Sequence, residues 1–118
     1  MVKVALVGCG RISRRHVDAI LASRGRVGIT WVCDKKEERA KALAEQLGCD
    51  YCTNYLDLNG KGVDVVSVLT PSGLHPRHVC AIAERVDAPN ILCEKPLSLT
   101  LREAYEVFRR VEKAGRRL

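Results

Sequence analysis

The chain has 118 residues, of which 47% are hydrophobic and 29% charged, a length and composition that suit one domain over residues 1–118. Only 4% of the residues are aromatic and the net charge of +6 is spread over several segments, which argues against a nucleic-acid partner. No stretch reaches the roughly 20 apolar residues that cross a membrane, so we expect a soluble, cytoplasmic protein without a membrane partner.

The first predicted strand, Val4–Val7, runs into a glycine turn that starts at Gly8 and leads into a helix. Gly8 permits a tight turn, Gly10 lets phosphate oxygens approach the backbone, and the helix N-terminus supplies N–H donors. Ser13 stands where such a turn usually has a third Gly or Ala. The helix then shows three apolar residues at helical spacing, Val17, Ile20 and Leu21. The segment predicts a pyrophosphate site, with an ordinary turn as the alternative.

The second predicted strand, Val27–Cys33, ends at Asp34, at the spacing from the turn where a carboxylate binds an adenosine ribose. Such a carboxylate repels a 2′-phosphate and favours NAD over NADP, although the neighbouring Lys35 and Lys36 weaken this preference. The alternative role of Asp34 is a helix N-cap. The following helix has one apolar face and closes at Gly48; the face comprises Ala40, Leu43, Ala44 and Leu47.

Residues 49–59 give a weak pattern, compatible with a short strand and a short helix around Tyr55. Cys49 and Cys52 have the C-x-x-C spacing of zinc and redox sites, but no second pair of ligands accompanies them. A thiol or metal protein is therefore a lesser alternative, and we expect no metal. The remaining cysteines lie in apolar strand or helix patterns and are interpreted as buried thiols.

A nearly unbroken apolar run, Val63–Leu69, is typical of a central strand in a parallel sheet. It ends in residues 70–75, a Thr-Pro-Ser-Gly-Leu-His loop whose small residues leave room for a flat ring. His75 either contacts a nicotinamide or ribose or simply starts the next helix, whereas His16 and His78 are expected at the surface. The next helix carries Val79, Ile82, Ala83 and Val86.

The last predicted strand, Asn90–Cys93, ends in Glu94, Lys95 and Pro96. Charged side chains in a predicted cleft indicate function, because their burial costs free energy unless they are paired or used. Lys95 could hold a substrate hydroxyl and assist proton transfer. The alternative is a plain surface ion pair in front of a proline.

Thr100 and Glu103 have the spacing of a capping box for a final helix. We expect its core face to comprise Leu101, Ala104, Tyr105, Phe108 and Val111. Because strands alternate with helices along the whole chain, the sequence predicts an α/β fold with a doubly wound, mostly parallel sheet of the Rossmann type.

Taken together, residues 7–12, Asp34, residues 70–75 and residues 94–96 resemble the N-terminal domain of the Gfo/Idh/MocA family of NAD(P)-dependent oxidoreductases over essentially the whole chain. The resemblance implies roles in NAD binding for Gly8, Gly10, Arg11 and Ile12 at the pyrophosphate, Asp34 at the adenosine ribose, and Leu69, Thr70, Pro71 and His75 at the nicotinamide. It also implies that Glu94 and Lys95 line the nicotinamide ribose, with Lys95 as catalytic lysine, and that the Lys95–Pro96 bond is cis.

Members of this family carry a second α/β domain that contacts the substrate and often forms a dimer interface. We therefore expect residues 1–118 to bind a dinucleotide without turning over a sugar or sugar-nucleotide substrate by themselves, and the full-length enzyme to be a homo-oligomer. Residues 70–76 are similar to those of dehydrogenases that act on UDP-N-acetylglucosaminuronate for surface polysaccharide; inositol and simple sugar dehydrogenases remain open. A non-catalytic dinucleotide-binding sensor or regulatory module is the alternative function.

Overall fold

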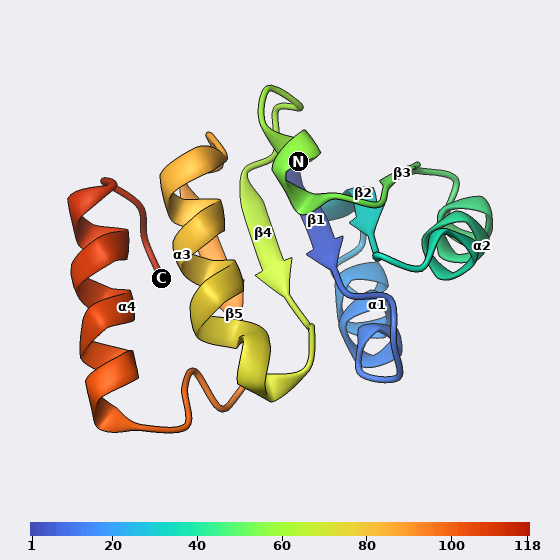
Figure 1. The fold of residues 1–118 in the computed structure, drawn as a ribbon. Coiled ribbons are helices and arrows are strands. Elements are labelled where there is room, and N and C mark those ends of the chain that lie inside the picture. Colours follow the sequence, from blue (N-terminus) through green and yellow to red (C-terminus); the bar gives the residue numbers. More distant parts are fainter.

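The computed structural model describes all residues, 1–118, and its strands form one parallel sheet in the order β3-β2-β1-β4-β5 (Figure 1). The strands are β1 (Val2–Val7), β2 (Val27–Cys33), β3 (Asp50–Cys52), β4 (Val65–Val68) and β5 (Asn90–Cys93). The helices are α1 (Ser13–Leu21), α2 (Glu37–Leu47), α3 (His75–Arg85) and α4 (Leu101–Lys113), with 3-10 turns at Tyr55–Leu58 and Ser72–Leu74. The predicted doubly wound parallel sheet is confirmed.

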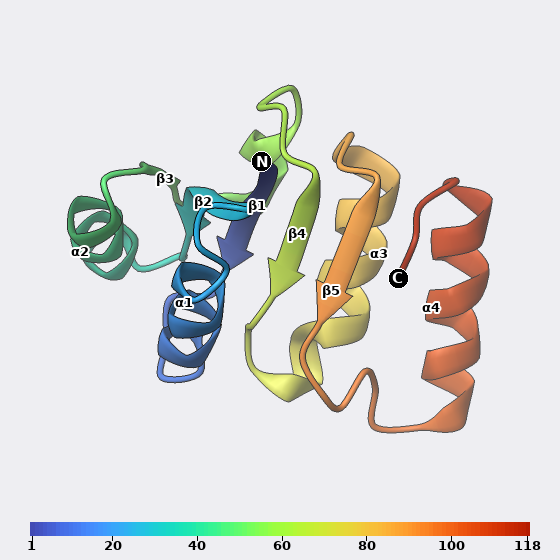
Figure 2. The same cartoon turned by 180° about the vertical axis from the view of Figure 1, so that it is seen from behind.

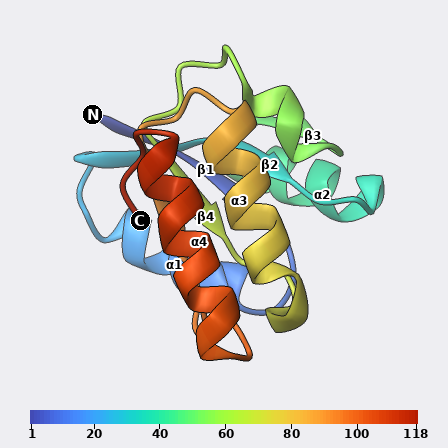
Figure 3. The same ribbon diagram turned by 60° about the vertical axis from the view of Figure 1, so that its left-hand side comes forward.

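Both faces of the central strand β1 are buried, which is why its sequence is continuously apolar. Ala5 and Val7 point into the larger core beneath α3 and α4, whereas Val4 and Leu6 point into the smaller core that α1 and α2 cover. Figure 3 shows α3 and α4 side by side in front of the strands. The sheet is therefore a middle layer between two pairs of helices.

Several predicted elements match the structure closely. The strands predicted over Val27–Cys33 and Asn90–Cys93 are β2 and β5, residue for residue, and the weak segment 49–59 contains β3 and the turn Tyr55–Leu58. The long apolar run predicted as one strand forms the shorter β4, although its flanking residues Val63 and Leu69 are also buried.

The core face predicted for α4 is wrong in part. Val107 and Val111 are buried, at 1% and 3% exposure, but the larger Leu101, Tyr105 and Phe108 are 79%, 75% and 53% exposed. Both sets recur at the three- and four-residue steps of a helix, so periodicity alone cannot choose between them. The valines face inward because α4 packs closely against α3, where small side chains let the helices approach.

Leu21, which shares the helical spacing of Val17 and Ile20, is the last residue of α1 and is 66% exposed. From the opposite side of the molecule, β5 lies in front of α3 without a helix over it (Figure 2), and Leu92 in β5 is 53% exposed. No helix has the length and apolar character that a membrane crossing requires.

Candidate functional site

A cleft of about 1100 Å³ opens beyond the carboxyl ends of the strands, where the loops after β1, β2, β4 and β5 converge. This is the point at which the strand order reverses around β1, the usual place for ligands in an open α/β sheet. The structure brings every residue singled out from the sequence to this cleft: Gly8, Gly10, Arg11, Ile12, Asp34, Leu69, Thr70, Pro71, His75, Glu94 and Lys95.

The two glycines of the turn after β1 are required for different reasons. Gly8 has a φ of +105°, and a Cβ there would lie 2.8 Å from the backbone carbonyl carbon and oxygen of Leu69. Only glycine therefore fits between the ends of β1 and β4. A Cβ on Gly10 would meet no protein atom within 4 Å, so nothing in the chain itself explains a glycine at this position.

The turn around Gly10 leaves donors free at the N-terminus of α1. The N–H groups of Gly10, Arg11 and Ile12 donate to no protein atom, while all three residues line the cleft. Ser13 is 4% exposed and its hydroxyl donates to the Gly10 carbonyl oxygen at 2.6 Å, so it closes the turn from within. Free N–H groups at a helix N-terminus suit the oxygens of a pyrophosphate.

Asp34 lies directly after β2, and backbone donors fix its carboxylate on both sides. Oδ2 accepts the Cys9 N–H at 3.0 Å and Oδ1 accepts the Lys36 N–H at 2.9 Å. The N-cap of α2 is Lys36 rather than Asp34, so the N-cap alternative for Asp34 is wrong. Each oxygen keeps a further lone pair, with which an ionised carboxylate accepts additional hydroxyl groups.

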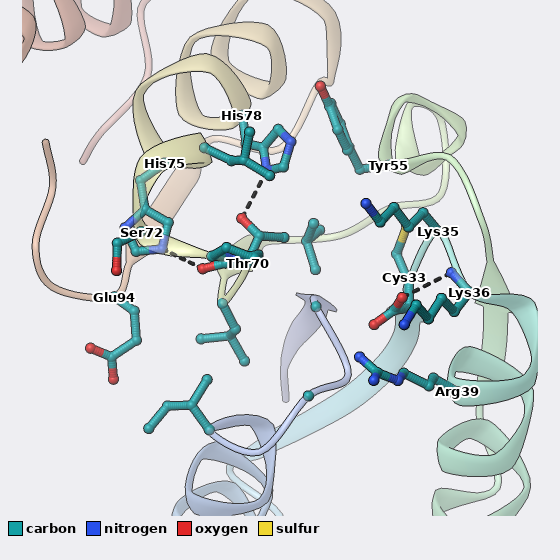
Figure 4. Close-up of a pocket in the computed structure, with 18 of the residues that line it drawn as sticks. Cys33, Lys35, Lys36, Arg39, Tyr55, Thr70, Ser72, His75, His78 and Glu94 are labelled. Carbon is teal, nitrogen blue, oxygen red and sulfur yellow. Dashed lines mark hydrogen bonds between the residues drawn. The ribbon is translucent and has the colours of Figure 1, made fainter.

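Positive side chains surround this end of the cleft. Lys35, Lys36 and Arg39 line it, and in Figure 4 they gather around the end of β2 at Cys33. None of the three takes part in an ion pair. Only the two lysines were singled out from the sequence. Arg39 was not predicted because it lies within α2, where a charged residue is indistinguishable from other solvent-exposed helix residues.

His78 lies in the cleft, although the sequence placed it at the surface. Its Nδ1 lies 2.8 Å from the Thr70 hydroxyl, and its ring centroid is 5.0 Å from that of Tyr55, which also lines the cleft (Figure 4). Burial, followed by the nearby Arg77 and His75, lowers the pKa of His78, so its ring stays neutral at pH 7. Tyr55 was missed because residues 49–59 carry little pattern.

His75 is the first residue of α3, as one of its two predicted roles requires, and it also lines the cleft; its contact with a nicotinamide or ribose stays a prediction. The ring is 1% exposed, with Nδ1 2.7 Å from the Pro96 carbonyl oxygen and Nε2 2.7 Å from the Thr70 carbonyl oxygen. His75 thereby joins the loop after β4 to the segment after β5. The Lys95–Pro96 bond is cis, as the resemblance implied.

Glu94 is held by two donors from different parts of the chain. Its Oε1 lies 3.2 Å from Nε2 of His16 in α1, and its Oε2 accepts the Lys95 N–H at 2.8 Å. The hydrogen bond from His16, followed by that from the Lys95 backbone, lowers the pKa of Glu94. His16 was expected at the surface, but its side chain is only 20% exposed. The prediction failed because the long-range contact with Glu94 leaves no local signal in the sequence. The neighbouring Lys95 is exposed.

Cys9 and Cys93 are poor nucleophiles. Burial, together with Asp34, raises the pKa of Cys9 to about 12, and burial raises the pKa of Cys93 to about 11. Cys33 and Cys52 are register partners in β2 and β3, and the hydrogen bond between their thiols raises the pKa of Cys33 and lowers that of Cys52. No group of three or more His, Cys, Asp or Glu side chains is placed to hold a metal.

Comparison with known sequences gives a match over nearly the whole chain. Residues 2–118 match the model of the GFO_IDH_MocA family, described as an oxidoreductase family with an NAD-binding Rossmann fold. A scyllo-inositol 2-dehydrogenase (NAD(+)) of Bacillus subtilis is 29% identical over 97% of this chain and 33% of its own length. An inositol 2-dehydrogenase of Mycolicibacterium vanbaalenii is 32% identical over 98% of this chain and 34% of its own.

Solved structures give a closely similar backbone. The WlbA dehydrogenase of Bordetella pertussis, in complex with NADH and UDP-GlcNAcA, superposes with a TM-score of 0.90 at 30% identity, covering 99% of this chain and 35% of the dehydrogenase. The chain thus spans about a third of the length of the relatives that it matches.

Proposed function

Because the chain belongs to the Gfo/Idh/MocA family of oxidoreductases, we propose that it is the NAD-binding domain of a dehydrogenase that acts on a hydroxyl-bearing carbon of a sugar or sugar nucleotide. The observation that carries the proposal is the cleft itself. It combines unpaired N–H groups at Gly10, Arg11 and Ile12 with a carboxylate at Asp34, beyond the reversal point of the sheet.

The residues present fit a dinucleotide. Open space at Gly10 admits phosphate oxygens, the free N–H groups receive them, and Asp34 accepts the hydroxyls of the adenosine ribose. Glu94 accepts hydroxyls of the second ribose, and Lys95 binds the substrate hydroxyl and holds or releases its proton. When bound, NAD supplies a nicotinamide ring that exchanges a hydride with the substrate carbon.

The substrate class is proposed from the relatives. The inositol dehydrogenases act on a cyclic polyol, and the WlbA structure contains UDP-GlcNAcA, a sugar nucleotide. We favour a sugar nucleotide, and with it a role in surface polysaccharide synthesis, because residues 70–76 resemble those of sugar-nucleotide dehydrogenases and the backbone matches WlbA with a TM-score of 0.90, against 0.84 for a protein of Sinorhizobium meliloti described as a myo-inositol dehydrogenase. We further propose a cytoplasmic location, and a homo-oligomeric complete protein as the family resemblance implies.

Titration calorimetry with NADH tests the proposal. We expect saturable 1:1 binding by residues 1–118 and a loss of about 1–3 kcal/mol of binding free energy in Asp34→Ala, because the ribose hydroxyls lose a charged acceptor. Glu38→Ala, which removes an exposed carboxylate of α2 outside the cleft, is the matched control and should bind NADH like the unaltered chain. A folded chain that shows no heat at millimolar NADH would contradict the proposal.

Lys95→Ala separates binding from chemistry. In a dehydrogenase of the relatives' length that contains this domain, the variant should lose turnover while NADH affinity stays largely unchanged. Stopped turnover together with lost NADH binding would show that Lys95 serves the cofactor rather than the substrate.

A further inference from the structure

We propose that His16 is a positioning residue for the nicotinamide half of the dinucleotide: it holds the Glu94 carboxylate in the orientation that receives the second ribose. This inference rests on the proposed function and assigns a role to a histidine that lies outside the cleft wall.

The contact joins two parts of the chain that no backbone pairing links. His16 lies in the first turn of α1, directly behind the glycine turn, and Glu94 follows β5, which is separated from β1 by β4. Because an ionised carboxylate only accepts hydrogen bonds, Nε2 of His16 carries the proton in the 3.2 Å contact with Oε1. The bond therefore ties the phosphate-binding end of α1 to the strand end where Lys95 lies.

The two oxygens of Glu94 are thereby fixed in different ways. The N–H of the adjacent Lys95 donates to Oε2 at 2.8 Å. Because the two residues are neighbours in the chain, this bond does not fix the carboxylate relative to the rest of the protein. Only His16 fixes Oε1 from outside, and the two side chains remain partly exposed, at 20% and 25%. Without His16, the carboxylate is free to turn toward solvent.

His16 itself cannot replace Glu94 as a ligand. Glu94 lines the cleft, whereas His16 does not. Its effect on a bound dinucleotide must therefore pass through Glu94, and this makes the role testable. The groups that lower the pKa of Glu94 are His16 from α1 and Lys95 from its own segment, so replacement of His16 leaves Lys95 alone.

A double-mutant cycle with three ligands tests the proposal. NADH and ADP-ribose contain the second ribose, whereas ADP contains only the adenosine and the phosphates. We expect His16→Ala to lower the affinity for NADH and ADP-ribose by roughly threefold to tenfold and to leave the affinity for ADP unchanged, because the hydrogen bond that orients Glu94 is lost. His16→Gln, which keeps a donor at a similar reach, should restore most of the affinity. In a Glu94→Ala background, His16→Ala should have no further effect.

Other outcomes overturn the inference. Equal weakening of all three ligands would mean that His16 supports the glycine turn, and full additivity with Glu94→Ala would mean that it does not act through Glu94. If NADH binds but His16→Ala leaves its affinity unchanged, this inference fails and the proposed function stands. If the unaltered chain binds no NADH, both fail. Amide NMR spectra of each variant show whether it is folded.

Discussion

At the scale of single residues, the two glycines of the turn after β1 should respond differently to the same substitution. Gly8→Ala forces a left-handed residue and a 2.8 Å contact with the Leu69 backbone, so it should cost about 3 kcal/mol or more of folding free energy. Gly10→Ala meets open space and should fold normally, but it should lower NADH affinity about tenfold or more, because the methyl group occupies the path of the phosphates.

Chemical denaturation measures the first effect and calorimetry the second. Each variant serves as the control for the other. Equal stability of the two variants would contradict the packing explanation for Gly8, and unchanged NADH affinity in Gly10→Ala would contradict the phosphate site.

The His16 contact also predicts a titration. Because hydrogen bonds from His16 and from the Lys95 backbone lower the pKa of Glu94, the carboxylate stays ionised as the pH falls through its ordinary range and is protonated only below it. A carboxyl group whose pKa is lower in the folded than in the unfolded state stabilises the folded protein at pH values above its unfolded-state pKa. This contribution is lost as the pH falls through its folded-state pKa.

His16→Ala should therefore raise the pKa of Glu94 toward that of an ordinary glutamate, while His16→Gln should keep it depressed. Carboxyl-carbon NMR titration of the free protein gives both values without any cofactor. A pKa that is the same in all three proteins would show that the bond between His16 and Glu94 does not form in solution.

Local sequence predicts the site residues that directly follow a strand. Asp34, Glu94 and Lys95 were found because each follows a recognisable strand, and the parallel sheet brings strand ends together. His16 and His78 were placed at the surface because their partners, Glu94 and Thr70, are supplied by other segments through tertiary contacts. Such contacts leave no periodic signal.

At the scale of elements, α4 tests which of two apolar stripes is structural. Val107→Ala should lower the folding free energy by about 1–3 kcal/mol, because the valine is 1% exposed and its loss leaves a cavity. Tyr105→Ala, in the same helix at 75% exposure, should change it by no more than about 0.5 kcal/mol. Denaturant melts compare the two, and a larger loss for Tyr105→Ala would mean that the exposed stripe is buried in solution.

Element boundaries were predictable where a strand ends abruptly. β2 and β5 are bounded by charged or turn residues, so their limits are visible in the sequence. The limits of the elements within residues 49–59 could not be predicted, because β3 has only three residues at the edge of the sheet and the following turn has no helical period. For this reason the predicted site did not include Tyr55, which lies in that turn. In α4, the predicted core face included Val111 but favoured the large apolar side chains over Val107, whereas packing against α3 selects the two valines.

At the scale of the whole molecule, the positive charge is arranged to suit an anionic ligand. The net charge of +6 includes Lys35, Lys36 and Arg39 at one end of the cleft, none of them in an ion pair. A dinucleotide carries two negative phosphates, so NADH affinity should fall steadily as salt is raised from 0.05 to 0.5 M, as estimated from the shorter screening length, about 14 Å against about 4 Å. Calorimetry at three salt concentrations measures the slope. Affinity independent of salt would mean that these cations do not contribute.

The chain as a whole is expected to bind NADH in the cleft beyond the carboxyl ends of the strands. Amide NMR spectra recorded during an NADH titration test it most directly, because each residue reports separately. We predict the largest shifts at residues 8–13, Asp34, Thr70 and Glu94–Lys95, with little change on the outer face of α4. Shifts centred on another surface, or no shifts at millimolar NADH in a folded chain, would contradict the account.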